Sequence, residues 1–381
     1  MTGQFALTDD QLAIQEMAQR FTADNITPFA GEWDEMSHFP RDVIQQTGEL
    51  GFGAIYVSEE AGGINLGRLE AALIMEAMAY GCPATSSYIS IHNMAAWMID
   101  CFGSDDLKTR YLPKLVTMEH IASYALTEPG SGSDAAGLKT SAVRDGDHYV
   151  LNGTKQFISG SGFNDIYVVM VRTSEHKSKG ITCLVIEKDT PGLSFGKPEK
   201  KLGWNASPTA QLIFEDCRVP VANRVGAEGE GFRFAMAGLD GGRLNIGACS
   251  LGGAQRCLDE AVKYTKERQQ FGQPIADFQN TQFMLADMAT ELEAARALLY
   301  LAAAKVTDNA PDKTRFSAMA KRLATDSGSN VVNNALQLFG GYGYLKEYPI
   351  ERFWRDLRVH SILEGTNQVM RMIVGRDMLR Q

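Results

Sequence analysis

The sequence predicts an α+β protein, mainly α, in which an all-β domain stands between two helical ones. Three observations lead to this prediction. Apolar residues recur at helical spacing near both ends of the chain, whereas the middle holds short runs rich in Val, Ile, Tyr and Thr. The 381 residues are also enough for about two or three domains. We therefore expect an N-terminal helical domain at 1–120, a middle β-barrel domain at 121–230 and a C-terminal helical bundle at 231–381.

The N-terminal part opens with a helix start signal. Thr8-Asp9-Asp10-Gln11 has the form of a capping box, in which the Thr8 hydroxyl accepts from the third helical N–H while Gln11 reaches back. Apolar residues then follow at positions i, i+3, i+4 and i+7: Ile14, Met17, Ala18 and Phe21. A second helix-rich stretch runs from about Arg68 to Thr117. Both stretches predict helices that bury one apolar face.

The middle of the chain changes character. Strands are predicted at 148–151, 165–172, 180–187 and 210–214, because these runs are rich in β-branched and aromatic residues and are separated by Gly, Pro and Asn-Gly. Asn152-Gly153 has the composition of a hairpin turn, so we expect the chain to reverse direction there.

Helices return from about Gly231. One set of apolar residues has the spacing of a bundle seam: Leu285, Met288, Leu292, Ala295 and Leu299. Thr366 is placed to cap a final helix, whose apolar residues are Val369, Met370, Ile373 and Met378.

Composition excludes several classes of function. The chain has 37 Lys and Arg against 46 Asp and Glu, a net charge of −9, which disfavours binding to nucleic acid or to an anionic membrane. No apolar run is long enough for a membrane span. The start, MTGQFALTDDQ, lacks the features of a secretory signal, so we expect a cytoplasmic protein, or a mitochondrial matrix protein if the chain is a processed eukaryotic form. The six cysteines form no CxxC pair, so we expect them to be reduced thiols. The sequence contains no HExxH motif, so it does not suggest metal catalysis.

One glycine-rich segment has a composition suited to ligand binding. Gly130-Ser131-Gly132-Ser133 lacks the strand–turn–helix context of a dinucleotide or P-loop motif, and by itself it indicates a plain turn. The wider segment 124–134, however, gathers hydroxyls and bare backbone amides in one loop, which suits the edge of a heteroaromatic ring or a phosphate. Phe157 and Ser159 follow about 20 residues later, at the end of a predicted strand.

Five strings in this order resemble the acyl-CoA dehydrogenase family over essentially the whole chain: 124–134, Phe157-Ile158-Ser159, Arg268-Gln269-Gln270-Phe271-Gly272, Gln337-Leu338-Phe339-Gly340-Gly341 and Leu363-Glu364-Gly365-Thr366. Finer strings, such as Ser90-Ile91-His92-Asn93-Met94 and Gly203-Trp204-Asn205, are similar to the branch that oxidises isobutyryl-CoA to methacrylyl-CoA in valine breakdown. The resemblance implies the cofactor FAD, an acyl-CoA substrate, an electron-transfer flavoprotein as partner, and a homotetramer.

The resemblance also implies which residues hold FAD. The flavin ring would be held by Tyr124, Ala125, Leu126, Thr127, Glu128, Pro129, Gly130, Ser131, Gly132, Ser133, Phe157, Ile158 and Ser159. The family often has Trp at the middle aromatic position, where Phe157 keeps the stacking but loses an indole hydrogen bond. The dinucleotide would be gripped, partly from a neighbouring subunit, by Arg268, Phe278, Gln279, Gln337, Leu338, Phe339, Gly340 and Gly341, with further contacts from Thr366, Asn367 and Gln368. Taken singly, Arg268 could equally be a solvated helix charge and 337–341 an ordinary helix stop.

Glu364 is implied to be the base that removes the α-proton of the thioester. Without the resemblance, it could simply be a carboxylate stabilised by a helix N-terminus. Its role requires a water-poor site that raises its pKa toward neutrality. Some branches of the family place the base next to the arginine that matches Arg243, but here that position is occupied by Gly241 and Gly242. No rival base is therefore visible.

Further positions match those that hold the CoA thioester: Ser133, Asp240, Gly241, Gly242, Arg243 and Arg376. Helix solvation is the alternative for Arg243, and a favourable charge near a helix end is the alternative for Arg376. His92 is expected to be a packed polar residue without a catalytic role.

The sequence is also compatible with several alternative functions. A straight-chain short or 2-methyl-branched acyl-CoA dehydrogenase is an alternative, because one methylene discriminates by only about 1–3 kcal/mol. A flavin oxidase, a non-catalytic acyl-CoA or flavin-binding protein, and a helical scaffold with an inserted β module are the others.

Overall fold

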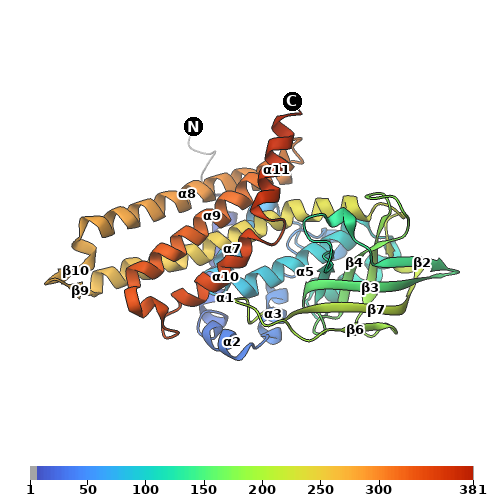
Figure 1. Ribbon diagram of the computed structural model, residues 1–381, viewed down its shortest axis with the longest axis horizontal. Coiled ribbons are helices and arrows are strands. Elements are labelled where there is room, and N and C mark those ends of the chain that lie inside the picture. The colour runs from blue at the N-terminus through green and yellow to red at the C-terminus, as the bar shows by residue number, and fades with distance from the viewer. Residues whose placement is uncertain (1–6, 381) are drawn as a thin grey trace.

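The computed structural model describes residues 7–380 and has three parts in chain order: helices, a sheet, and helices again (Figure 1). The sheet lies at one end of the elongated molecule, and the long helices of the C-terminal part extend toward the other end. The predicted mainly helical α+β fold is therefore confirmed.

The N-terminal part consists of α1 (Asp9–Asn25), α2 (Ala30–Met36), α3 (Arg41–Gln46), α4 (Arg68–Ala79), α5 (Pro83–Phe102) and α6 (Asp105–Val116). The capping box of α1 is present as predicted, because the Thr8 side chain accepts from Gln11 N–H and Gln11 bonds back to the backbone of Thr8. Helices α4 and α5 are buried on nearly every side, which is why their sequences are apolar or small almost throughout.

The middle part is one sheet built from β1 (Ala122–Ala125), β2 (Ser141–Asp145), β3 (His148–Ser159), β4 (Ile166–Arg172), β5 (Ile181–Glu187), β6 (Leu193–Phe195), β7 (Thr209–Pro220) and β8 (Arg224–Val225). The strands follow the order β6-β7-β3-β2-β4-β5-β8, and β1 pairs in parallel with β4. All four predicted strands are present. The path has two free ends, β6 and β8, so the sheet is not closed and the term barrel overstates it.

The predicted turn at Asn152-Gly153 is wrong. Both residues lie inside β3, where the register against β7 shifts between Leu151 and Gly153. Gly153 has φ +144, and a methyl group there would lie 2.7 Å from the Cα of Thr140. The glycine therefore allows a bulge and a close approach within a long strand. The chain instead reverses direction just before β3, at Gly146.

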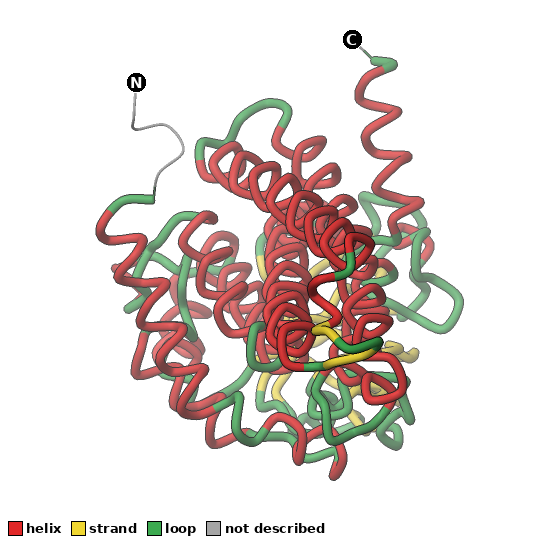
Figure 2. Tube along the Cα trace, turned by 90° about the vertical axis from the view of Figure 1, so that its left-hand side faces the viewer, coloured by secondary structure: helices red, strands yellow, loops and turns green. Residues whose placement is uncertain are grey.

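The C-terminal part comprises α7 (Gly231–Glu267), β9 (Gln269–Gln270), β10 (Gln273–Pro274), α8 (Gln279–Thr307), α9 (Lys313–Phe339), α10 (Ile350–Arg358) and α11 (Asn367–Met378). Four of the five predicted seam residues of α8 are fully buried, and Leu285 is partly buried. Thr366 caps α11 as predicted. Helix α11 projects from the bundle in both views (Figures 1 and 2). Its residue Met378 is exposed.

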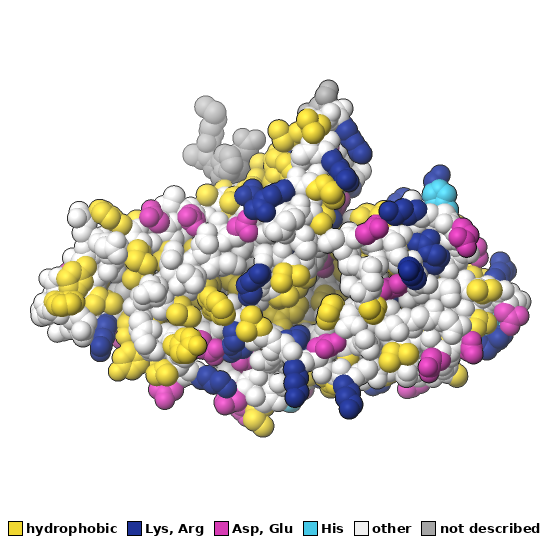
Figure 3. Space-filling model, in the orientation of Figure 1, with side chains coloured by type: hydrophobic (Ala, Val, Ile, Leu, Met, Phe, Trp, Pro, Cys, Tyr) yellow, Lys and Arg dark blue, Asp and Glu magenta, His cyan; other side chains and the backbone are white. Residues whose placement is uncertain are grey.

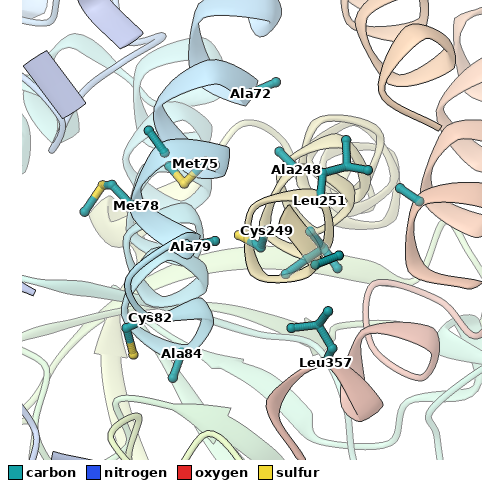
Figure 4. Close-up of a cluster of buried hydrophobic side chains, with 14 of the residues drawn as sticks. Ala72, Met75, Met78, Ala79, Cys82, Ala84, Ala248, Cys249, Leu251 and Leu357 are labelled. Atoms are coloured by element: carbon teal, nitrogen blue, oxygen red, sulfur yellow. The ribbon is translucent and has the colours of Figure 1, made fainter. Parts of the chain in front are cut away.

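The core joins the N-terminal and C-terminal helices. Small and sulfur-containing side chains of α4 face those of α7, with Leu357 of α10 nearby (Figure 4). At Gly252, a methyl group would lie 2.0 Å from the carbonyl oxygen of Glu76, so α4 and α7 can approach only because this residue has no side chain. Within residues 7–380, every helix is too short or too polar to cross a membrane.

Candidate active site

Glu364 lies in a tight turn that leads into α11. Its backbone is left-handed, with φ +54, and Gly365 follows with φ +87. Thr366 then caps the helix, since its Oγ1 accepts from Val369 N–H at 3.2 Å. A left-handed non-glycine residue is costly and is common where function requires it. The turn therefore directs a carboxylate away from the helix axis and into the protein.

The carboxyl group of Glu364 is enclosed. A methyl group on Gly242 of α7 would lie 2.7 Å from Oε2 of Glu364, so the carboxyl rests directly on bare backbone. The residue as a whole is partly exposed, but Oε2 is buried and has no hydrogen-bond partner among residues 7–380. Burial raises the pKa of Glu364 to about 7, against the opposing charges of Arg243 and Lys321. These are the properties predicted for a proton-abstracting base.

Two buried cations hold the backbone of this turn. Arg243 donates from Nε to the carbonyl oxygen of Glu364 at 3.4 Å, while its Nη1 pairs with Asp240 Oδ1 at 2.7 Å. Lys321 of α9 donates from Nζ to the carbonyl oxygen of Gly365 at 2.8 Å. The predicted residues Asp240 and Arg243 are thus brought to Glu364, but their charged groups already bond to each other.

The sequence reasoning missed Lys321. It is fully buried, and burial lowers its pKa to about 8. A signal was present: one helical turn away on either side lie the small residues Ser317, Ala318, Ala324 and Thr325, all buried. A lone lysine on such a face has to find acceptors inside the protein.

Two tyrosines lie close enough to Glu364 for its charge to raise their pKa values. The Tyr124 hydroxyl from β1 is buried and has no hydrogen-bond partner in the described part of the chain, 7–380. The pKa of Tyr124 is raised well above its usual value by burial and by the charge of Glu364. The Tyr56 hydroxyl accepts from Asn245 Nδ2 at 3.4 Å, and its pKa is raised by burial. Arg68 covers the Tyr56 ring at 3.7 Å. Tyr124 was predicted, whereas Tyr56 and Arg68 were not.

The loop predicted to hold a flavin ring follows β1. A methyl group on Gly130 or on Gly132 would meet no atom of the described residues within 4 Å, so open space faces this backbone. Glu128 points the other way. Its carboxylate accepts from the N–H groups of Lys139 and Thr140 and from Lys155 Nζ, at 2.6, 2.9 and 2.7 Å. The Glu128 side chain is therefore bonded within the protein and stabilises the conformation of the loop.

Phe157 stands at a second bulge of β3, where the register against β7 shifts between Lys155 and Ile158. Its φ is +58 and its side chain is 65% exposed. The bulge holds the aromatic ring at the surface, where a second planar ring can stack on it. Ile158 is buried, and the carbonyl oxygen of Ser159 accepts from Ser123 Oγ at 2.7 Å.

The residues predicted to grip the dinucleotide gather at the opposite end of the bundle. Arg268 and residues 337–341 line one groove of about 430 Å³, and Phe278 is the N-cap residue of α8. Gln279 is exposed at the first position of α8. From Gly242 to Arg268, α7 extends about 39 Å at 1.5 Å per residue. Within one chain, this groove and the Glu364 turn are thus too far apart to hold one ligand.

The remaining predicted residues are scattered. The Asn367 side chain is buried, accepts from Lys321 Nζ and donates to Thr325 and Asp326, so only its backbone is free for a ligand. Gln368, Ser133 and Arg376 are exposed. Arg376 lies about 15 Å along α11 from Thr366.

His92 is packed, as expected. Its ring nitrogens lie 3.0 Å from the carbonyl oxygen of Leu115 and from the N–H of Ala122. Burial lowers the pKa of His92 to about 4, which keeps the ring neutral near pH 7.

The chain matches three protein-family descriptions that follow one another along the sequence. They are the acyl-CoA dehydrogenase N-terminal domain at residues 8–119, the middle domain at 123–217 and the C-terminal domain at 229–379. The protein belongs to the acyl-CoA dehydrogenase family, whose members are FAD-dependent oxidoreductases that act on acyl-CoA.

Two curated relatives and one solved structure are similar to this chain over nearly its whole length. The mitochondrial isobutyryl-CoA dehydrogenase of Dictyostelium discoideum is 57% identical over 98% of this chain and 90% of its own length. That of Bos taurus is 52% identical over the same shares. Among solved structures, a chain described under the electron transferring flavoprotein of Acidaminococcus fermentans has a TM-score of 0.97 and 43% identity, covering 99% of this chain and all of its own.

The residues present fit FAD. The exposed Phe157 ring, the open backbone of the 124–133 loop and the unpartnered hydroxyl of Tyr124 offer stacking and hydrogen bonding to a flavin ring. The bare backbone of Gly340 and Gly341 beside Arg268 suits a dinucleotide.

Proposed function

We propose that the protein oxidises a short, α-branched acyl-CoA to its α,β-unsaturated product, and that the substrate is isobutyryl-CoA and the product methacrylyl-CoA. The observation that carries this proposal is the buried, unpartnered carboxyl oxygen of Glu364, whose pKa of about 7 suits a base near neutral pH. The two isobutyryl-CoA dehydrogenases at 52–57% identity support the choice of acyl group.

The role proposed for Glu364 is proton abstraction. The α C–H bond breaks, its proton passes to the carboxylate, and the electron pair forms the new C=C bond as the β-hydrogen leaves with its own pair. Bound FAD would supply the acceptor for that hydride. The backbone N–H of Glu364 has no acceptor among residues 7–380, so it is free to donate to the thioester oxygen as negative charge develops there.

The same proposal assigns the binding residues. Residues 124–133 and 157–159 would hold the flavin ring, with Glu128 acting through the loop rather than by contact. Residues 366–368 would add contacts at the start of α11. Ser133, residues 240–243 and Arg376 would hold the CoA thioester, with the Asp240–Arg243 pair presenting a fixed backbone rather than a free cation.

We propose a homotetramer in which each FAD lies between two subunits. The distance of about 39 Å along α7 supports this, because Arg268 and residues 337–341 could reach an FAD near Glu364 only from a neighbouring copy. Apolar side chains gather on the projecting α11 (Figure 3). Phe271 and Leu379 are 93% and 90% exposed. Such surfaces are typical of interfaces.

The proposal also covers the electron acceptor, the domain boundaries and the compartment. The acceptor of the electrons is an electron-transfer flavoprotein, as the structural relative suggests. The domain boundaries are 1–120, 121–230 and 231–381, which keep β1 to β8 within the middle domain. The compartment is the cytoplasm, or the mitochondrial matrix for a processed eukaryotic chain.

The deciding experiment compares isobutyryl-, butyryl-, 2-methylbutyryl- and isovaleryl-CoA as substrates. The purified protein should be yellow, should bleach with isobutyryl-CoA, and should have its highest kcat/KM for that substrate with an electron-transfer flavoprotein as acceptor. A higher value for butyryl-CoA would reassign the acyl group. Rapid reoxidation by air would indicate an oxidase, and a protein that takes up no FAD would contradict the whole proposal.

A further inference from the structure

Lys321 occupies an unusual position for a lysine. It lies in the middle of α9, its side chain is fully buried, and it makes no ion pair with a carboxylate among residues 7–380. Its Nζ donates instead to two neutral oxygens, the carbonyl of Gly365 at 2.8 Å and Oδ1 of Asn367 at 2.9 Å. Burying an ammonium group is costly, and here the two oxygens of the Glu364 turn and the nearby charges of Glu364 and Asp326 offset that cost.

The two acceptors lie on either side of the helix cap Thr366, immediately after Glu364. Arg243 reaches the preceding carbonyl, that of Glu364, from α7 at 3.4 Å. Two cations from different helices thus hold two successive carbonyl groups of a turn whose residues both have positive φ. The direction of the Glu364 side chain depends on this backbone conformation, because one change of φ would swing the carboxyl group off Gly242.

We infer that Lys321 is a positioning residue for the reaction: by holding Gly365 and Asn367 it fixes the Glu364 carboxyl group over Gly242 and leaves its charge acting on that carboxyl group without pairing to it. This inference rests on the proposed function, in which Glu364 is the base. A direct ion pair would stabilise the carboxylate too strongly for a base, whereas an unpaired cation nearby keeps part of it ionised near neutral pH.

The charge of Lys321 has a defined effect. It lowers the pKa of Glu364 against the larger effect of burial, and Arg243 acts in the same direction. The titratable or charged groups that face Glu364 or Lys321 are Tyr56, Tyr124, Asp240, Arg243, Asp326 and His360. Burial lowers the pKa of His360 to about 3, so His360 does not change charge near pH 7, and Asp240 is paired with Arg243.

The experiment uses the full-length, FAD-loaded enzyme with the variants Lys321→Met and Lys321→Arg. Lys313→Met, a partly buried lysine at the start of the same helix, is the matched control. For Lys321→Met we expect kcat to fall about 10- to 100-fold, the effect of a small misplacement of a catalytic group. We also expect the acidic limb of the pH profile of kcat/KM to move to higher pH. Lys321→Arg keeps the charge and should keep the limb where it is.

The outcomes separate the two proposals. A Lys321→Met enzyme with normal kcat, or with lowered kcat and an unmoved acidic limb, would overturn the positioning role while leaving Glu364 as the base. Full turnover by Glu364→Gln would overturn both. If Lys321→Met does not yield folded, yellow protein, Lys321→Gln carries the same two readouts, since it removes the charge but keeps an N–H donor.

Discussion

Two glutamates of this protein have a buried carboxyl group near a buried lysine, and they behave in opposite ways. Glu128 accepts a direct bond from Lys155 at 2.7 Å and two more from backbone N–H groups. Burial alone would raise its pKa, but the charge and hydrogen bond of Lys155 lower it. Glu364 receives no bond from Lys321, and burial raises its pKa to about 7. Burial also lowers the pKa of both lysines to about 8.

The comparison shows that a buried Glu–Lys neighbourhood does not by itself define a function. The behaviour of the glutamate depends on which groups accept the hydrogen bonds of the lysine. Lys155 gives one to the Glu128 carboxylate, and the pair becomes a fixed support for the loop that follows β1. Lys321 gives its bonds to backbone and amide oxygens, and the Glu364 carboxyl stays free to exchange a proton.

The largest expected effect is that of Glu364→Gln. Turnover should fall by about 10²–10⁴, the usual contribution of a positioned base, while FAD stays bound because the amide has nearly the same shape. Steady-state kinetics and the visible spectrum measure both quantities. Glu347→Gln, on an exposed segment, is the control, and near-normal turnover in Glu364→Gln would remove the base from the mechanism.

Lys155→Met should act on stability instead. It leaves the Glu128 carboxylate buried and uncompensated, so we expect the free energy of unfolding to fall by about 3–5 kcal/mol. Denaturant unfolding measures this. Adding Glu128→Gln should restore part of the loss, since the uncompensated charge is then gone. If the double variant is no more stable than the single one, the ion pair is not what supports the loop.

Gly242→Ala tests the contact beneath the Glu364 carboxyl group. The added methyl would lie 2.7 Å from Oε2, so the carboxyl has to move, and we expect kcat to fall about 10²-fold. Gly31→Ala on α2 is the matched control, because its methyl would meet nothing within 4 Å. Equal kinetics of the two variants would show that the site tolerates the displacement.

The smallest expected effect is on the pH dependence of stability. Because the folded-state pKa of Glu364 is raised, this residue should favour the folded state at low pH, and that contribution should be lost as pH rises from about 4.5 through about 7. Glu128 has the opposite sign: its contribution is lost as pH falls below the usual range of a glutamate. Unfolding of the wild type and Glu364→Gln across pH 5–8 measures the Glu364 part, and parallel curves would contradict it.

Local chemistry was readable from the sequence. The capping box at Thr8, the cap at Thr366 and the β-rich runs were predictable, because each depends on a few neighbouring residues. Glu364 could be singled out as the candidate base because it lies in a known string. The inward direction of Glu128, the bulge at Gly153 and the open sheet were not, because each depends on a partner strand or a side chain far along the chain.

The sequence by itself therefore determined the order of the three parts, the family and the candidate base. The tertiary structure decided which charges meet: it placed Lys321 under the Glu364 turn, Arg68 over Tyr56, and Arg268 about 39 Å along α7 from the site. The physical reason is that the pKa and the hydrogen bonds of a buried charged group depend on the few groups packed around it. Those groups come from helices and strands far apart in the sequence, and no local sequence pattern shows which of them pack together.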